Sequence, residues 1–231
     1  MENYTEQDKF LLAVDCIIFG FDKQDLKILL IKRDFEPEKG NWSLMGGFLK
    51  KNESLDEAAN RVLHHLTGLE NVYLEQLQTY SALDRDPVER TVSVSYFALI
   101  NLTEKTKINE DFSAKWFSIN EAPPLIFDHN QMVSDAISWL RHSVATKPIG
   151  FELLPEKFTM KQLQSVYEVI LGEELDKRNF INKINALDIL IKIEEKDRSS
   201  SRKGSFLYTF DEVKYKAKVA DGFTFKFMGV K

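Results

Sequence analysis

In the first half of the chain, hydrophobic residues occur in short runs, each about as long as a β-strand. Helical spacing interrupts these runs twice, at residues 54–68 and at about 131–145. Short apolar runs that alternate with amphipathic segments are typical of a mixed α/β sandwich, a sheet covered by helices. The predicted strands are residues 11–19, 26–32, 42–49, 72–80, 92–100 and 114–119.

The first predicted helix carries strong local signals at both ends. Ser54 and Glu57 form an S-x-x-E capping box, in which each side chain accepts a hydrogen bond from a backbone N–H group of the other residue. Gly68 stands where a left-handed C-terminal cap belongs. One apolar stripe is formed by Leu55, Ala58, Ala59, Val62, Leu63 and Leu66. The stripe predicts that this helix packs on the sheet.

The pattern changes in the last third of the chain. A second capping box, formed by Thr159 and Gln162, predicts the start of a helix that ends at Gly172, and Asp176 begins another. Apolar residues then alternate in LDILIKIEE (187–195) and in SFLYTF (205–210), as in two strands. Two helices joined by a short turn and followed by a hairpin describe a winged helix-turn-helix.

A linker separates the two patterns. The segment KPIGFELLPEKF (147–158) contains Pro148, Gly150 and Pro155, which favour turns over regular structure. The sequence therefore predicts an α+β protein with two domains, residues 1–150 and residues 151–231.

Charge is distributed unevenly between these domains. The 231-residue chain has 31 basic and 36 acidic side chains, a net charge of −5. Residues 1–150 hold 16 basic and 23 acidic residues (−7), and residues 151–231 hold 15 and 13 (+2). An acidic chain argues against a nucleic-acid partner, but the basic residues of the second domain gather on its second helix and hairpin loop.

Further features of the composition limit where the protein works. The N-terminal MENYTEQDKF is polar and acidic, unlike a signal peptide, and no apolar run approaches the roughly 20 residues needed to span a membrane. The single Cys16 excludes an intramolecular disulfide framework. We expect a cytoplasmic protein that does not contact a membrane.

Residues 47–69, GFLKKNESLDEAANRVLHHLTGL, resemble the Nudix box, G-x5-E-x7-R-E-U-x-E-E-x-G-U, where U is a bulky apolar residue. The residues on their expected positions are Gly47, Glu53, Arg61, Leu63, Gly68 and Leu69. The resemblance implies the Nudix-like α-β-α sandwich for the first domain.

Three glutamates of the box are replaced by Val62, His65 and Leu66. These positions converge on one helix face, which in Nudix hydrolases supplies carboxylate oxygens to Mg²⁺. Valine and leucine offer Mg²⁺ no oxygen, and a neutral imidazole is a poor substitute. His64 and His65 are adjacent and point about 100° apart, so they do not easily share a transition metal. We therefore expect no metal site, no cofactor, no catalytic residues and no enzyme activity.

A degenerate Nudix domain followed by a winged helix resembles the Nudix-related transcriptional regulators of the NrtR and AraR type. Residues 84–99 and 153–184 carry further similarity to that family. The resemblance implies a repressor that binds a double-stranded operator and is controlled by a small effector. We expect a homodimer, because a single winged helix reads few base pairs and two-fold operators are usual for such proteins. The implied effector is an ADP-ribose-like nucleotide in the NrtR type or a pentose such as arabinose in the AraR type. The regulated genes would serve NAD-related or sugar metabolism.

The second helix of the winged domain and the hairpin loop hold the predicted DNA contacts. Arginine pairs with guanine and asparagine with adenine in the major groove, while a basic loop holds phosphates. The predicted residues are Lys177, Arg178, Asn179, Asn182 and Lys183 on the helix and Arg198, Arg202 and Lys203 in the loop. Asn179 also fits a role at the helix start. A solvated helix face, or a winged helix that binds protein, is the alternative.

For the effector, sugar recognition uses paired donors and acceptors together with an aromatic platform. Trp42, Asp84, Arg85 and Arg90 fit these roles. They also fit structural roles, with Trp42 in the core and residues 84–86 in a turn with local ion pairs. The alternative function is a Nudix hydrolase of ADP-ribose, or of a related nucleoside diphosphate compound, with an atypical metal site.

Overall fold

The computed structural model describes residues 3–22, 25–68, 72, 74–102, 114–147, 149–199 and 202–222. They form two compact units. The first unit comprises residues 1–19, 27–99 and 104–136, and the second comprises residues 20–26, 100–103 and 137–231. Leu69, Pro148, two residues of the hairpin loop and the tail after Gly222 lie outside the described residues, as does the side chain of Leu66. The domain limits 1–150 and 151–231 stay a prediction.

The first unit is built around a sheet with the strand order β3-β2-β1-β6-β5. Its strands are β1 (Leu11–Phe21), β2 (Leu26–Lys32), β3 (Trp42–Ser43), β4 (Met45–Phe48), β5 (Leu74–Tyr80), β6 (Thr91–Asn101) and β7 (Lys115–Ser118). Strand β4 pairs with β1, and β7 pairs with β2, both antiparallel. Ends of β1, β2 and β6 belong to the second unit by contact.

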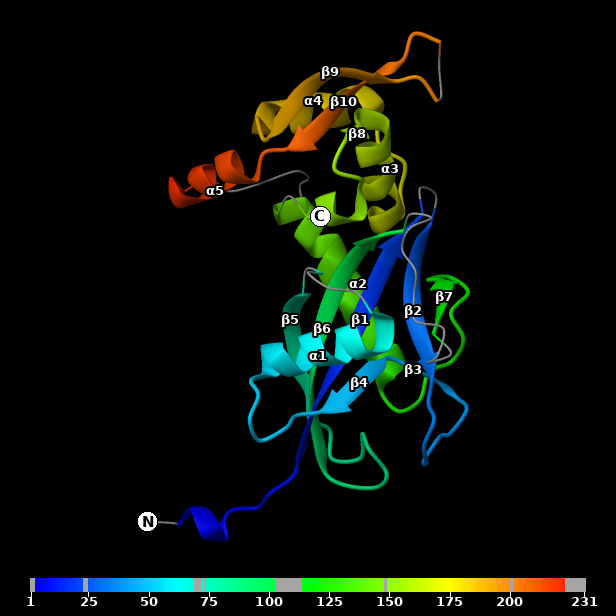
Figure 1. Ribbon diagram of the computed structural model, residues 1–231, viewed down its shortest axis with the longest axis vertical. Coiled ribbons are helices and arrows are strands. Elements are labelled where there is room, and N and C mark those ends of the chain that lie inside the picture. The colour runs from blue at the N-terminus through cyan, green and yellow to red at the C-terminus, as the bar shows by residue number, and fades with distance from the viewer. Residues whose placement is uncertain are drawn as a thin grey trace. The chain divides into compact units, whose positions relative to one another are not determined.

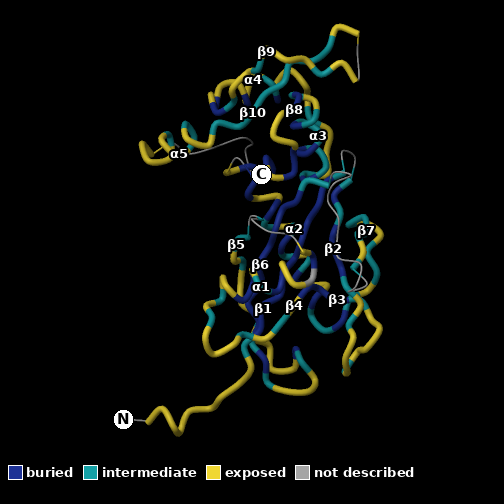
Figure 2. The backbone as a smooth tube through the Cα atoms, in the orientation of Figure 1, coloured by how far each residue is buried: buried dark blue, intermediate teal, exposed yellow. Residues whose placement is uncertain are grey.

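Two helices cover this sheet on opposite faces, α1 (Leu55–Thr67) and the first part of α2 (His129–Thr146) (Figure 1). Because both faces are covered, β1 and β6 are buried along almost their whole length, as Figure 2 shows. The predicted capping box and glycine cap of α1 are confirmed: Ser54 and Glu57 bond reciprocally, and Gly68 has a φ of 70°. The layered arrangement is the predicted α-β-α sandwich.

The predicted strand over 42–49 is divided into β3 and β4 at Leu44. The physical reason lies in the hydrogen bonding of Leu44, whose backbone N–H donates to Nδ1 of His129 (3.1 Å) instead of to a neighbouring strand. The division places Gly46 and Gly47 opposite Asp15 and Val14 of β1.

In the second unit, helices α3 (Met160–Leu171) and α4 (Lys177–Leu187) form the helix-turn-helix. The hairpin of β9 (Leu190–Asp197) and β10 (Ser205–Phe210) follows, and the short β8 (Phe158–Thr159) pairs with β10. The predicted cap residues of both helices are confirmed: Thr159 begins α3, Gly172 ends it in the left-handed region, and Asp176 begins α4.

Aromatic contacts hold the second unit together. Tyr167 of α3 meets Phe180 of α4 edge to face, with ring centroids 5.5 Å apart. Phe210 stacks on Phe151 at 4.4 Å, and Phe151 lies in the 3₁₀ turn Phe151–Leu153. The first pair joins α4 to α3, and the second joins the hairpin to the 3₁₀ turn. Phe180, Ile184 and Leu187 are buried, so they face inward as predicted.

A further helix, α5 (Glu212–Ala220), follows the hairpin, where the sequence pattern gave no assignment. It is tied to the C-terminal end of α4 by Asp188, which pairs with Lys214 (2.6 Å) and Lys218 (3.6 Å). Asp188 has a φ of 52°, and its negative charge lies where the helix dipole is also negative. The two lysines offset that repulsion.

Removal of the α1 cap tests the local basis of this fold. We expect Ser54→Ala to lower the free energy of unfolding by about 1 kcal/mol, because the Glu57 N–H loses its acceptor. Ser54→Asp keeps an acceptor and is the control, with little loss. Urea unfolding followed by circular dichroism measures both, and equal destabilisation by the two variants would contradict the capping role.

Candidate functional site

A cavity of about 240 Å³ opens in the first unit, beside the start of the Nudix-box segment. Strands β1, β2, β3 and β4, the 81–90 loop and the start of α2 all contribute to it. Its lining residues are Ala13, Asp15, Ile31, Arg33, Asp34, Phe35, Ser43, Leu44, Gly46, Gly47, Phe48, Arg85, Asp86, Thr91, Phe127 and His129. The lining combines aromatic walls with a charged floor, as small-molecule sites do.

Asp15 is the acid at the floor of this cavity, and its carboxylate is almost fully buried. The Ser93 hydroxyl donates to its Oδ2 at 2.6 Å. A Cβ atom on Gly46, its partner across β1 and β4, would lie 2.2 Å from Asp15 Oδ1. Only glycine therefore leaves the carboxylate in its place.

Arg85 carries the positive charge nearest to this acid. Its guanidinium donates to both oxygens of Asp128 (2.8 and 2.9 Å) and lies 3.7 Å from Asp15 Oδ2. The Arg85 side chain is only 4% exposed, so its charge is balanced within the protein by two carboxylates. The sequence suggested local ion pairs within residues 84–86. Arg85 instead pairs with Asp128, which is 43 residues away in the sequence.

His129, the first residue of α2, lies beside the same acid. Because its Nδ1 accepts the Leu44 N–H, the ring proton is assigned to Nε2. Nε2 lies 3.8 Å from Asp15 Oδ1, beyond hydrogen-bond distance. Burial lowers the pKa of His129, and Asp15 and Asp128 act in the opposite direction. The imidazole is therefore neutral near pH 7.

Arg33 is a second cation of the cavity, and its surroundings differ from those of Arg85. Its guanidinium carbon lies 3.8 Å from the centroid of the Phe35 ring and 5.3 Å from that of Phe127. Its Nε donates to the Phe35 carbonyl (3.2 Å), and among the described residues it forms no ion pair. Burial lowers the pKa of Arg33, against Asp86, Asp15, Asp34 and Glu38, which raise it.

The structure brings one of the four predicted effector residues, Arg85, into the cavity. Trp42 contacts Phe117 edge to face at 4.8 Å, and Asp84 is exposed. Arg90 donates to the carbonyls of Ser81 and Ala82 and so holds the 81–90 loop. These three do not line the cavity, although a ligand role for them stays a prediction.

Asp15, Arg33 and His129 line the cavity but were not among the residues predicted from the sequence. The single acid inside the apolar run 11–19 was a usable signal, because a buried charge requires partners. The other two residues carried no local signal, since only the fold brings them to Asp15.

The Nudix-box residues that match the motif hold the loop before α1. Arg61 donates to both oxygens of Glu53 (2.8 and 2.6 Å) and to the Phe48 carbonyl (3.1 Å). Hydrogen bonds from Arg61 hold the pKa of the Glu53 carboxyl at about 2. Val62 is buried, close to Gly47, whereas His65 is exposed. Among the described residues, no group of three His, Cys, Asp or Glu side chains is arranged to hold a metal.

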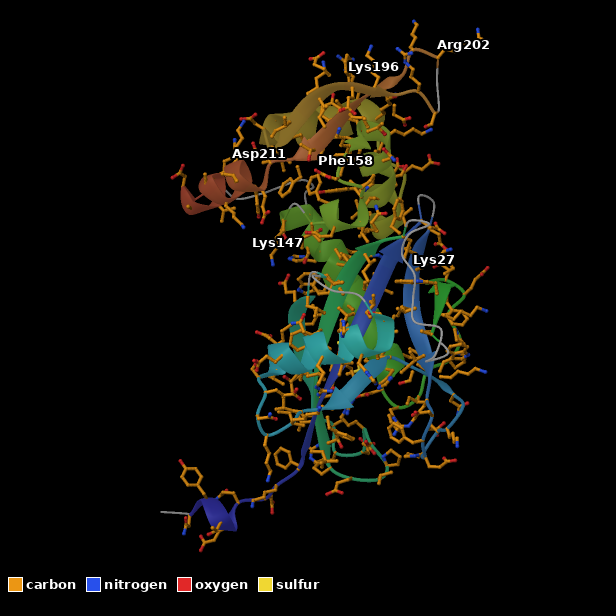
Figure 3. All side chains as sticks on the ribbon, viewed as in Figure 1. Lys27, Lys147, Phe158, Lys196, Arg202 and Asp211 are labelled. Atoms are coloured by element: carbon orange, nitrogen blue, oxygen red, sulfur yellow. The ribbon has the colours of Figure 1, made fainter. Side chains whose placement is uncertain are left out.

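The predicted DNA-contact residues all lie on the surface of the second unit. Exposed side chains on α4 are those of Lys177, Arg178, Asn179, Asn182 and Lys183, and those in the hairpin loop are Arg198, Arg202 and Lys203. Arg202 lies at the tip of the loop (Figure 3). The backbone N–H of Asn179 donates to Asp176, so this residue takes part in the helix start while its side chain is exposed.

Strand β9 adds two cations that are not among the predicted DNA contacts. Lys192 and Lys196 lie 3.6 and 4.4 Å from the centroid of the Phe206 ring on β10. Lys196 projects from the hairpin in Figure 3. The register pairs Phe206 with Lys196 and Tyr208 with Lys192, which places these side chains on one face of the hairpin.

Known protein families match both units. Residues 9–140 match the NUDIX domain, and residues 150–210 match the NrtR DNA-binding winged helix domain. The chain belongs to the NrtR family of Nudix-related transcriptional regulators. The predicted combination of a Nudix fold with a winged helix is thereby confirmed.

No helix within the described residues is long and apolar enough to cross a membrane.

Two curated relatives differ in function. The ADPR responsive transcriptional repressor NtrR of Acinetobacter baylyi is 34% identical over 207 residues, which cover 87% of this chain and 82% of that protein. The ADP-ribose pyrophosphatase of Methanocaldococcus jannaschii is 38% identical over 129 residues, which cover 55% of this chain and 73% of that protein.

Shewanella oneidensis NrtR provides the structural comparison. Its crystal structure with a 27mer DNA has a TM-score of 0.81 and 31% identity, covering 93% of this chain and 97% of that one. Its NUDIX domain, complexed with ADP ribose, has a TM-score of 0.52 and 32% identity, covering 60% of this chain and 94% of that one.

The neutral His129 predicts a pH dependence of stability. Since its folded pKa is below the unfolded value of about 6.5, the unfolded chain binds more protons as the pH falls. The stability that the neutral imidazole contributes is complete above about pH 6.5 and is lost as the pH falls toward the folded pKa. Urea unfolding at pH 7.5 and 5.5 measures this loss.

The control is His129→Asn, because its amide oxygen can still accept the Leu44 N–H but does not titrate. The wild type should lose more stability than this variant between the two pH values. Parallel curves for the two proteins would show that folding does not lower the pKa of His129.

Proposed function

We propose that this protein is a DNA-binding transcriptional repressor whose effector is ADP-ribose, bound in the cavity of the first unit. The observation that carries the proposal is the match over 93% of the chain to an NrtR structure that contains DNA. The genes it controls would then belong to NAD-related metabolism. A DNA-binding regulator of this kind works in the cytoplasm.

The charges of the second unit support DNA binding. Exposed cations lie on two separate elements, α4 and the hairpin, while the apolar face of α4 is occupied by the unit's own core. A helix that reads bases beside a loop that holds phosphates is the expected division of roles. Because one winged helix reads few base pairs, we infer a homodimer on a two-fold operator. The domain limits 1–150 and 151–231 are part of this proposal.

ADP-ribose is favoured as the effector over a pentose. The two relatives are an ADP-ribose responsive repressor and an ADP-ribose pyrophosphatase, and neither is named for a free sugar. The cavity also contains Arg33, a cation without an ion-pair partner among the described residues, which suits a phosphorylated ligand better than a neutral sugar. The sugar-sensing alternative, arabinose included, gains no support from these relatives.

The second candidate function is hydrolysis of ADP-ribose, which the pyrophosphatase relative favours. Against it stand Val62, buried beside Gly47, and His65, because neither offers Mg²⁺ a carboxylate oxygen. We therefore propose that the Nudix unit binds without catalysing. Incubation with ADP-ribose and Mg²⁺ should release no AMP, and release of AMP would support the hydrolase instead.

The α4 assignment is tested by the double substitution Lys177→Ala/Arg178→Ala. The operator is first selected from a randomised duplex library by binding to the wild-type protein. Fluorescence anisotropy should then show at least about tenfold weaker binding by the double variant, since each lost base or phosphate contact costs about 1–3 kcal/mol. Lys39→Ala/Lys51→Ala, which removes two exposed lysines from the first unit, should bind normally. Equal affinity of all three proteins would rule out α4 as the reading helix.

Effector control is tested on the same operator. We expect ADP-ribose to release the wild-type protein from DNA, because an effector that prefers one conformation shifts the population toward it. Arabinose at the same concentration should leave the complex intact. Release by arabinose alone would contradict the assigned effector.

A further inference from the structure

The floor of the cavity presents a donor and an acceptor that do not bond to each other. Nε2 of His129 carries the ring proton, and its distance to Asp15 Oδ1 is 3.8 Å. A hydroxyl oxygen placed between them can lie about 2.8 Å from both atoms, donating to the carboxylate and accepting from the imidazole. A ligand hydroxyl group thus completes this pair.

The carboxylate of Asp15 can accept further hydrogen bonds. Asp15 accepts one short hydrogen bond, from Ser93, and the Arg85 guanidinium stays 3.7 Å away because it is held by Asp128. An ionised carboxylate accepts up to about four hydrogen bonds. Two neighbouring hydroxyl groups of one ring would use that capacity, as the 2- and 3-hydroxyls of a ribose do.

The charge of the lining restricts the ligand further. Asp34 and Asp86 line the cavity in addition to Asp15, so a bare phosphate would meet repulsion. The compensating cation is Arg33, whose side chain forms one hydrogen bond among the described residues, through Nε. The contacts to Phe35 and Phe127 fix the guanidinium plane and leave its terminal N–H groups for an anion. A suitable ligand therefore carries hydroxyl donors next to a phosphate.

We propose that the cavity binds the terminal ribose 5-phosphate half of the effector, with ribose hydroxyls on Asp15 and His129 and the attached phosphate on Arg33. This inference rests on the proposed function, since ADP-ribose contains that half. The volume of about 240 Å³ is below the range of about 300–1,000 Å³ for pockets that enclose a whole drug-sized ligand. The adenosine half stays at the mouth, where Phe35 and Phe48 are about half exposed.

Calorimetric titration of the full chain tests this orientation with ADP-ribose, ADP and ribose 5-phosphate. ADP lacks the terminal ribose, so the wild type should bind ADP-ribose at least about tenfold more tightly than ADP. Ribose 5-phosphate should displace ADP-ribose. His129→Asn keeps an acceptor for the Leu44 N–H but removes the Nε2 donor. This variant should bind ADP-ribose about tenfold more weakly than the wild type does and bind ADP with unchanged affinity. A general loss of structure would not produce that difference.

Arg33→Gln is the second variant. It should lower the affinity for ADP-ribose and for ADP alike, by about tenfold, because both nucleotides carry the diphosphate. Lys39→Gln removes an exposed cation from the same loop and should change neither. The inference is overturned if His129→Asn changes the affinities for ADP-ribose and ADP equally, or changes neither. In that case, binding of ADP-ribose by the wild type still upholds the proposed function. Failure of the wild type to bind ADP-ribose overturns both.

Discussion

A carboxylate buried within a β-strand must be stabilised by its neighbours, and Asp15 imposes this requirement on the first unit. Ser93 of β6, Arg85 of the 81–90 loop and His129 of α2 all converge on it. Each belongs to a different element, so one acid fixes the position of a strand, a loop and a helix. The glycine opposite Asp15 exists for the same reason, because any side chain there would occupy the space of the carboxylate. The cavity is the space that these constraints leave.

The parts of the fold that depend on local chemistry were predictable from the sequence. The capping boxes of α1 and α3 join residues three positions apart, and Gly172 ends α3 within the same segment, so each signal could be read where it stood. The cavity could not be found in this way. Arg85 meets Asp128 across 43 residues and Ser93 meets Asp15 across 78, and no local pattern records those distances.

The Nudix-box segment shows that a motif can keep its architecture after its metal positions change. Glu53 and Arg61 bond to each other and to the loop, and Gly47 allows that loop to pass close to Val62. These interactions need no metal. At the replaced positions, Val62 is buried close to Gly47 and His65 is exposed, so the segment keeps its packing without the glutamates of the box. The motif match therefore predicted the fold of the first unit correctly.

The pairing of Asp188 with α5 bears on the electrostatics of DNA binding. Lys214 and Lys218 share the single carboxylate of Asp188, Lys216 pairs with Glu212, and Lys157 pairs with Glu195. A cation that already has a carboxylate partner displaces few of the ions condensed on a duplex, so its contribution to counterion release is small. The described basic residues of the second unit thus include a set with carboxylate partners and a set exposed on α4 and the hairpin. The salt sensitivity of the complex would count only the second set, and the net charge of the chain would not reveal it.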